Sequence, residues 1–161
     1  ALAALGALVL PALAQAPAAL AQPGLRIRAI KVDVSPIRAS MGDPTAAWVE
    51  AALPGALAQS LGPYMAPGDR NGATLVARID YLYLGSSSGG PGPLGSTQDT
   101  INGSLLLKGP RGTLVANTPL RAISSYYPTP VDQALVERAL QGRVVALAQA
   151  FAGWAPRQLG L

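Results

Sequence analysis

Two aspartates are the residues of this chain that best suit general acid–base chemistry. Asp80 lies near the end of an alternating segment, and Asp99 follows a segment rich in Gly, Ser and Pro. Carboxylates at a strand end and a loop end can act as a general acid and a general base. The alternative is structural, since Asp80 can pair across a sheet and Asp99 can cap a turn. A carboxylate-dependent hydrolase of envelope glycan is therefore the third and least favoured of our functional hypotheses.

The composition removes most other catalytic chemistry. The 161 residues contain no cysteine and no histidine, which excludes disulfides, thiolate nucleophiles, His-dependent triads and the usual zinc sites. Ser86, Ser87 and Ser88 lie in a Gly-rich segment, but neither a phosphate-binding nor a serine-nucleophile pattern surrounds them. We interpret them as linker residues. We expect a protein that is not an enzyme and that binds no cofactor or metal.

The charge balance is mildly basic. Twelve Lys and Arg against eight Asp and Glu give a net charge of +4, which favours adhesion to anionic lipid, lipopolysaccharide or peptidoglycan. The basic residues cluster only at Arg26, Arg28 and Lys31, and no aromatic residues are interleaved there to stack on bases. We therefore expect no nucleic-acid binding.

The first residues are typical of an export signal. Ala1 to Leu13 is an uncharged apolar run that is too short to cross a bilayer, and small residues follow it. The best cleavage pattern is Ala19-Leu20-Ala21. We predict a signal-peptide remnant at 1–21, a mature chain from Gln22 without a transmembrane span, and a soluble periplasmic location. The alternative is a buried helix of the domain itself.

The rest of the chain, residues 22–161, predicts a single α+β domain. Strands are expected from residue-by-residue alternation, with a bulge near Ala29 in the first strand and an edge, bulge or break at Pro119 in the last. The expected strands cover residues 25–35, 74–84, 100–108 and 113–127, and a flexible Gly/Ser/Pro loop covers residues 85–98. A tight turn at Gly109-Pro110-Arg111-Gly112 should connect the last two strands.

Two helices are expected from apolar residues spaced by three and four positions. The first is predicted from an Asp43-Pro44 cap to about Leu61, with a kink or break near Pro54 or two short helices. The second is predicted to begin at Thr129-Pro130-Val131-Asp132 and to end before Pro156. Its apolar stripe is formed by Val136, Leu140, Val144, Leu147, Phe151 and Trp154.

The order β-α-β-β-β-α predicts a two-layer sandwich. A four-stranded, mainly antiparallel sheet should carry both helices on one face. In the strand at 74–84, alternation places Tyr81 and Tyr83 on the same face as Leu75 and Ile79, and Arg78 on the other. The opposite face of the sheet should remain open.

A possible interaction surface follows from this arrangement. Tyrosines next to a predicted helix start could line a groove, because aromatic side chains with polar tips suit interfaces, and two arginines could form a basic patch on the open face. The alternative is that these tyrosines border the core and the arginines only solvate the sheet. The candidate residues are Arg78, Asp80, Tyr81, Tyr83, Arg121, Tyr126 and Tyr127.

The order of an export signal, a strand, a helix, a three-stranded meander and a C-terminal amphipathic helix resembles small accessory proteins of the bacterial envelope. It looks like the lipopolysaccharide-assembly lipoproteins and the auxiliary lipoproteins of lipid transporters, over Leu25 to Trp154. Those families are tethered through a lipidated cysteine, which these 161 residues lack. The resemblance therefore implies an envelope accessory protein without that anchor.

The leading hypothesis is a non-enzymatic periplasmic binding or assembly domain that contacts an envelope protein or an anionic lipid. The alternative is a periplasmic carrier of a lipid or small molecule, in which the helices part from the sheet to admit an apolar ligand. An exposed sheet face could equally support a homodimer, so the oligomeric state stays open.

Overall fold

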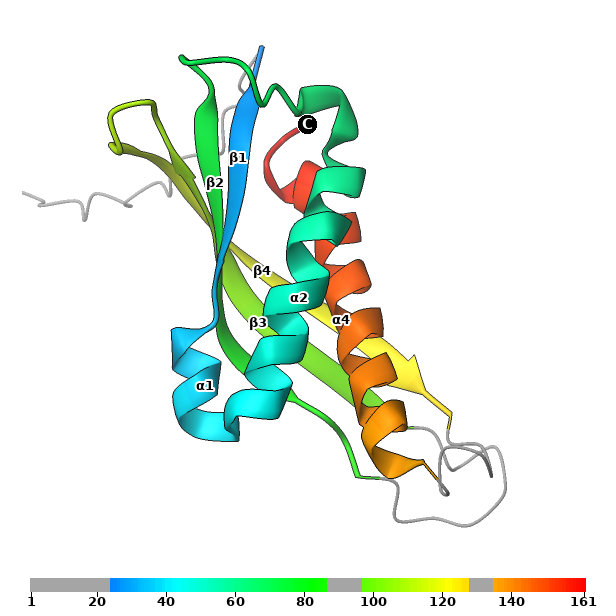
Figure 1. Cartoon of the computed structure of the whole chain (residues 1–161). Helices are drawn as coiled ribbons and strands as arrows, with labels where there is room; N and C mark the ends of the chain where they lie inside the picture. Colours follow the sequence, from blue (N-terminus) through cyan, green and yellow to red (C-terminus); the bar gives the residue numbers. More distant parts are fainter. Residues whose placement is uncertain (1–23, 87–96, 128–134) are drawn as a thin grey trace, which may run out of the picture.

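The computed structural model describes residues 24–86, 97–127 and 135–161, and it has the predicted α+β architecture (Figure 1). Four strands form one layer, and the helices lie on one face of it. The elements are β1 Ile27–Asp33, α1 Ser35–Met41, α2 Asp43–Ser60, the short 3-10 turn η1 Gly62–Tyr64, β2 Ala73–Tyr83, β3 Thr97–Lys108, β4 Leu114–Tyr126 and α4 Val136–Gln158. The predicted segment 1–21 lies outside the described residues.

The sheet has the order β1-β2-β3-β4 and is mixed. β2 pairs antiparallel with β3, and β3 antiparallel with β4, as a meander predicts. β1 pairs parallel with β2, because α1 and α2 carry the chain back to the end at which β1 began. The expected four-stranded sheet with helices on one face is confirmed, but the sheet is mixed rather than mainly antiparallel as predicted, because β1 pairs parallel with β2.

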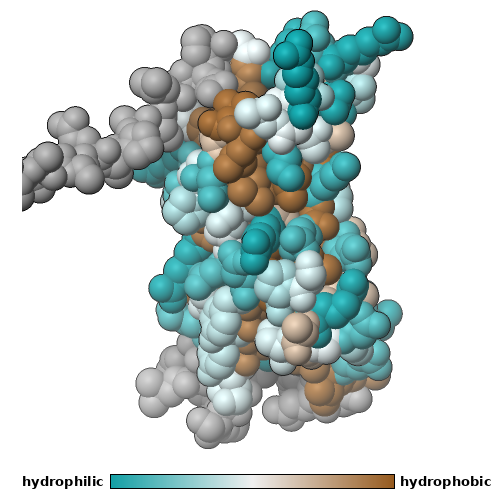
Figure 2. Space-filling model, turned by 90° about the vertical axis from the view of Figure 1, so that its left-hand side faces the viewer, coloured by the Kyte–Doolittle hydropathy of each residue, from teal (hydrophilic) through white to brown (hydrophobic). Residues whose placement is uncertain are grey.

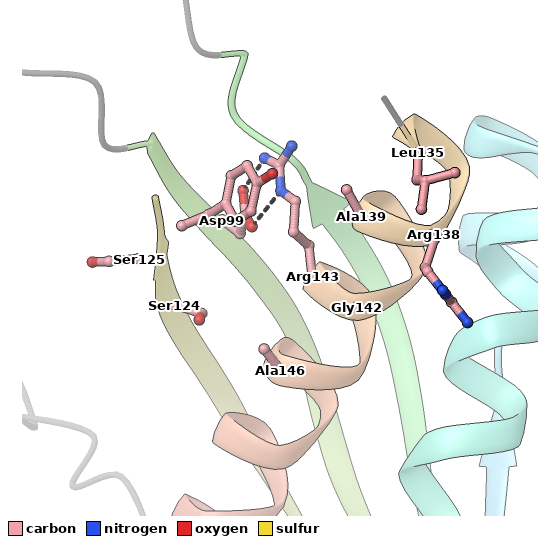
Figure 3. A pocket seen from close by; sticks show the side chains of 10 residues that line it. Asp99, Ser124, Ser125, Leu135, Arg138, Ala139, Gly142, Arg143 and Ala146 are labelled. Atoms are coloured by element: carbon pink, nitrogen blue, oxygen red, sulfur yellow. Dashed lines mark hydrogen bonds and ion pairs between the residues drawn. The ribbon is translucent and has the colours of Figure 1, made fainter. Parts of the chain in front are cut away.

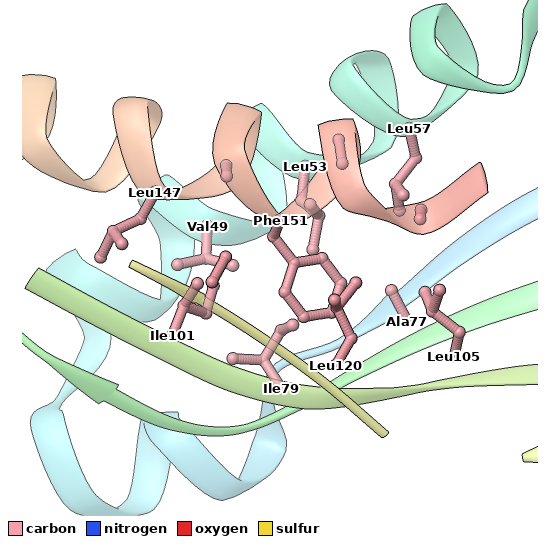
Figure 4. Packing of buried hydrophobic residues seen from close by; sticks show 14 of the residues in the cluster. Val49, Leu53, Leu57, Ala77, Ile79, Ile101, Leu105, Leu120, Leu147 and Phe151 are labelled. Atoms are coloured by element: carbon pink, nitrogen blue, oxygen red, sulfur yellow. The ribbon is translucent and has the colours of Figure 1, made fainter. Parts of the chain in front are cut away.

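The core lies between the helices and the sheet. Leu53 and Leu57 of α2 and Phe151 of α4 have no exposed surface, and Figure 4 shows Phe151 pointing from the helix layer toward Ile79 and Leu120 of the sheet. Each such buried side chain stabilises the fold by roughly 1.5–3 kcal/mol. The periodicity that predicted the two long helices therefore identified the side chains that join the layers.

Bulges in β1 and β2 change which face the following side chains occupy. The register of β1 shifts between Ile27 and Ala29, where the sequence predicted a bulge. The register of β2 shifts between Ile79 and Tyr81, with Asp80 as the additional residue. The expectation that Tyr81 shares a face with Ile79 is therefore wrong: Tyr81 pairs with Asn102 on the open face, because a one-residue bulge inverts the alternation.

The first helical region differs from prediction at its start. α1 was not expected, and it separates β1 from α2. The residue that caps α2 is Gly42, at φ 84°, so Asp43 is the first helical residue rather than the cap. α2 continues through Pro54 without a break. Its residues Val49, Leu53 and Leu57 are buried on one side as predicted.

The final helix is shifted toward the C-terminus relative to prediction. The expected start at Thr129-Pro130-Val131-Asp132 lies outside the described residues, but Leu135 has non-helical backbone angles, so α4 begins at Val136. α4 also passes Pro156 and ends at Gln158, because the missing proline N–H affects only the last turn. Val136 and Trp154, the two ends of the predicted stripe, are exposed.

The hairpin between β3 and β4 forms where predicted. The N–H of Gly109 donates to the carbonyl of Thr113 at 2.8 Å, and Gly112 takes a positive φ of 81°. β3 begins at Thr97, so residues 97 and 98 belong to a strand rather than to the predicted loop at 85–98, and residues 87–96 of that loop lie outside the described part. Pro119 lies in β4, which is an edge strand of the sheet. An edge was one of the three positions expected for this proline, beside a bulge and a strand break.

Candidate functional site

The predicted interaction residues lie on two sides of the sheet. Four of them lie on the face away from the helices, namely Arg78, Tyr81 and Tyr83 of β2 and Arg121 of β4. Each pairs with an even-numbered residue of β3 between 100 and 104, and these even-numbered positions belong to that face. Tyr126 instead pairs with Thr97 and faces α4. The groove expected between these two sets of tyrosines does not exist, because the sheet separates them.

The open face combines aromatic, aliphatic and basic side chains. Across the three strands, Tyr83 lies in register with Thr100 and Ile123, and Tyr81 with Asn102 and Arg121. Tyr81 and Tyr83 are each 50% exposed and Ile123 is 48% exposed. Figure 2, which views the molecule from the side of the open face, shows brown side chains gathered in its upper half, at the end where β2 begins. Tyr81, Tyr83 and Ile123 lie toward the other end, where β2 and β4 end.

The carboxylates of this face are already engaged. Arg78 donates from Nε to Asp80 at 2.9 Å. Asp33 accepts hydrogen bonds from the hydroxyl and the backbone N–H of Ser35, and these bonds hold the pKa of its carboxyl below the ordinary value of 3.8, with a smaller contribution from Arg78. No described residue pairs with Arg121. Within the described residues, the open face therefore offers an unpaired cation in the same register row as Tyr81, with Asn102 between them.

Asn102 adds a polar feature between the tyrosine and the arginine. Its Oδ1 atom is buried and accepts no hydrogen bond from any described residue. A buried acceptor without a donor carries a desolvation penalty of about 1–3 kcal/mol. The guanidinium of Arg121 has five donors and lies in the same register row as Asn102. A ligand that holds Arg121 in place would also position it to donate a hydrogen bond to Oδ1 of Asn102.

A pocket lies on the other side of the sheet, between the end of β4 and the start of α4 (Figure 3). Its volume is about 210 Å³. The small residues Ala139, Gly142 and Ala146 line its helix side, and Ser124 and Ser125 lie on the strand opposite. Small side chains at helical spacing leave this space open.

The pocket is built around the guanidinium of Arg143. Its Nε donates to one oxygen of Asp99 at 2.9 Å and its Nη2 donates to the other at 2.5 Å. Nη2 also lies 2.6 Å from the carbonyl oxygen of Gly85, and the N–H of Gly85 donates to Asp99. The Cζ atom lies 4.5 Å from the ring centre of Tyr126. The hydrogen bond to Asp99 is the main cause that raises the pKa of Arg143.

This arrangement changes the interpretation of the two aspartates. Asp99 is 1% exposed and bound to Arg143, whereas Asp80 is bound to Arg78 at the bulge of β2, on the exposed side. The two carboxylates are therefore not brought together as an acid–base pair. Among the described residues, no group of metal-ligating side chains comes together either.

Arg138 and Arg143 were missed by the sequence analysis. Arg143 lies three residues after Leu140 and four before Leu147, at the border of the apolar stripe of α4. A basic residue at such a border can turn its charged end toward a buried acid. Arg138 begins at the rim of the pocket, but its side chain points away from it, toward α2 (Figure 3), and has no partner among the described residues.

Comparisons with known proteins show a likeness in fold. No family model and no curated protein matches the chain. The crystal structure of a proposed lipoprotein from Caulobacter crescentus CB15 matches with a TM-score of 0.50 and 11% identity, over 81% of this chain and 86% of that one. A minor lipoprotein from Acinetobacter baumannii matches with a TM-score of 0.39 and 12% identity, over 82% and 93%. In the described residues, no helix is long and apolar enough to span a membrane.

Proposed function

We propose that this chain is a non-enzymatic accessory domain of the bacterial envelope that binds another envelope component, a protein or an anionic lipid, in the periplasm. The observation that carries the proposal is the open sheet face, where Tyr81, Tyr83 and Ile123 are half exposed and Arg121 has no partner among the described residues. Aromatic and arginine side chains are enriched where proteins meet partners. The likeness to a proposed lipoprotein in fold supplies the envelope setting by analogy.

The structure gives less support to the carrier hypothesis. The layer between helices and sheet is filled by side chains such as Leu53, Ile79 and Phe151, none of which is exposed. A lipid could enter only if these layers separated and their contacts were lost. Lipid that copurifies reproducibly with the chain after native extraction would reverse this preference.

The proposal is tested by site-specific photocrosslinking in intact cells. A photoreactive residue at Tyr83 reports on the open face, and one at Gln149, an exposed position on α4, serves as the matched control. We expect Tyr83 to yield a specific adduct with an envelope protein or lipid and Gln149 to yield none. Identical adducts at both positions would refute binding through the open face.

The non-enzymatic part of the proposal has its own test. A panel of envelope glycans, esters and phosphates is incubated with the purified chain and with its Asp80→Asn and Asp99→Asn variants. We expect no turnover by any of them. Turnover by the unaltered chain that either substitution abolishes would overturn this part of the proposal.

A further inference from the structure

The outer edge of β4 changes character along its length. Its first half contains Pro119 and a register irregularity opposite Lys108, and prolines and bulges are common ways to protect a sheet edge from pairing. Its second half, from Leu120 to Tyr126, pairs with β3 in an unbroken register. No described strand pairs with the outer side of β4. Within the described part of the chain, the second half is therefore a regular edge without a pairing strand.

The opposite edge of the sheet is partly covered at its start. The N–H of Ala66 donates to the carbonyl of Ile27 at 2.7 Å, and Met65 forms a bridge with Ile27. The bulge at Arg28 interrupts the same strand. An added strand would therefore meet a contact and an irregularity at the start of β1 that the second half of β4 does not have.

Pro119 also indicates which backbone groups of β4 face outward. Proline cannot donate to a ladder, so within a sheet it occupies positions whose N–H direction points away from the neighbouring strand. Pro119 pairs with Ser104 of β3 without breaking the register. Because the direction of N–H groups alternates along an antiparallel strand, the N–H groups of Arg121, Ile123 and Ser125 also point outward.

The pocket lies beside this same edge. Ser124 and Ser125 of β4 line it together with Ala139, Gly142 and Ala146 of α4. An added strand would place alternate side chains on the helix side of the sheet. The pocket volume of about 210 Å³ has room for one large apolar side chain of such a strand.

The charges around the edge favour an acidic occupant. Arg121 flanks the edge on the open face and has no partner among the described residues. Arg138 begins at the pocket rim, but its side chain points away from the pocket, toward α2 (Figure 3). The charge of Asp99 is neutralised by Arg143, and Glu137 lines a neighbouring hollow instead of this pocket. A second copy of this chain would bring its own Arg121 to the same edge, which like-charge repulsion disfavours.

We propose that the second half of β4 receives an extended acidic segment of another protein, which adds to the sheet as a strand and places one apolar side chain in the pocket. This surface adds the backbone edge of β4 and the pocket on the helix side to the open face, with which it shares Arg121 and Ile123. The Gly142→Leu variant, which leaves the open face unaltered, separates the two proposals. Main-chain hydrogen bonds supply much of the affinity in such complexes, and the pocket supplies specificity.

The test begins with a displayed library of random linear peptides selected on the full chain. We expect enriched peptides to alternate apolar with other residues and to contain Asp or Glu. The most enriched peptide is then synthesised and titrated against variants. Ile123→Pro removes one outward N–H, and we expect at least a tenfold weaker affinity, equivalent to about 1.4 kcal/mol. Asn117→Pro, in the protected half, is the matched control and should bind as the unaltered chain does.

A second pair of variants examines the pocket without altering the sheet. An added Cβ at Gly142 or at Gly153 of α4 meets nothing within 4 Å, so leucine at either position should leave the fold intact. Gly142→Leu fills the pocket and should weaken the peptide about tenfold, whereas Gly153→Leu should not. Equal binding by all four variants would overturn the inference. So would a self-associated chain that Ile123→Pro converts to monomer, since the occupant would then be a second copy.

Discussion

Arg143 of α4 binds both carboxylate oxygens of Asp99 in β3, although 44 residues separate them in the sequence. The side chains are 10% and 1% exposed respectively, so this is a buried ion pair. The pair ties the last helix to the sheet, and through Gly85 it also ties the end of β2.

Loss of the cation from this pair should destabilise the protein strongly. Arg143→Gln leaves the Asp99 carboxylate buried without a charge partner, and we expect the free energy of unfolding to fall by about 3 kcal/mol. Adding Asp99→Asn removes the uncompensated charge and should recover at least about 1 kcal/mol. Urea unfolding of the single and double variants measures both values. A double variant that is as unstable as the sum of the singles would contradict the coupling.

The carboxylate of Asp33 should make a pH-dependent contribution to stability. Its pKa is lowered in the fold by the hydrogen bonds from Ser35, so the contribution is fully present above the unfolded pKa near 3.8. It is lost as the pH falls through the lower folded value. We expect Asp33→Asn to reduce stability by about 0.5 kcal/mol at neutral pH, because solvent weakens the bond. Unfolding measured at neutral pH and at about pH 2 should show the difference disappear at the lower pH.

Gly103 should not tolerate a side chain. A Cβ at this position would lie 2.2 Å from the carbonyl oxygen of Arg78, next to the bulge of β2. We expect Gly103→Ala to lower the free energy of unfolding by about 3 kcal/mol, since buried backbone would have to move. Gly109→Ala is the control, because its Cβ would meet only an ordinary contact at 3.6 Å. Equal thermal midpoints for the two variants would show that the bulge is more adaptable than the geometry indicates.

Gly142 should behave in the opposite way. It lies inside α4, and an added Cβ meets nothing within 4 Å. Alanine loses less backbone entropy than glycine when it becomes helical, so Gly142→Ala should raise the free energy of unfolding by about 0.5–1 kcal/mol. Chemical denaturation measures the change. A decrease would mean that this part of α4 needs a glycine for a reason that its helical backbone does not show.

The parts of the fold that were predicted depend on local periodicity. Val49, Leu53 and Leu57 recur every four residues and were sufficient to predict α2 and its buried face. Tyr81 was assigned to the wrong face because apolar alternation continues in the sequence across the bulge at Asp80. The structural signal for that bulge is Gly103 on the neighbouring strand, which local patterns cannot connect to Asp80.

The candidate sites depend on pairings between distant segments. Asp99 was considered as a catalytic carboxylate, since nothing in the sequence connects it to Arg143. The parallel pairing of β1 with β2 likewise became visible only in three dimensions. Arg78 and Arg121 were correctly expected on one face, because both belong to regular stretches of strand. Whether that face is an interaction surface remains a prediction that the crosslinking experiment tests.

The direction of α4 has a practical consequence for any surface-based assay. Leu161 lies at the same end of the molecule as the start of β1, and α4 begins at the opposite end, beside the pocket (Figure 1). The 23 residues of α4 extend for about 34 Å. A chain immobilised through its C-terminus would thus present the pocket and the free end of β4 outward from the support, accessible to a probe as large as another folded protein.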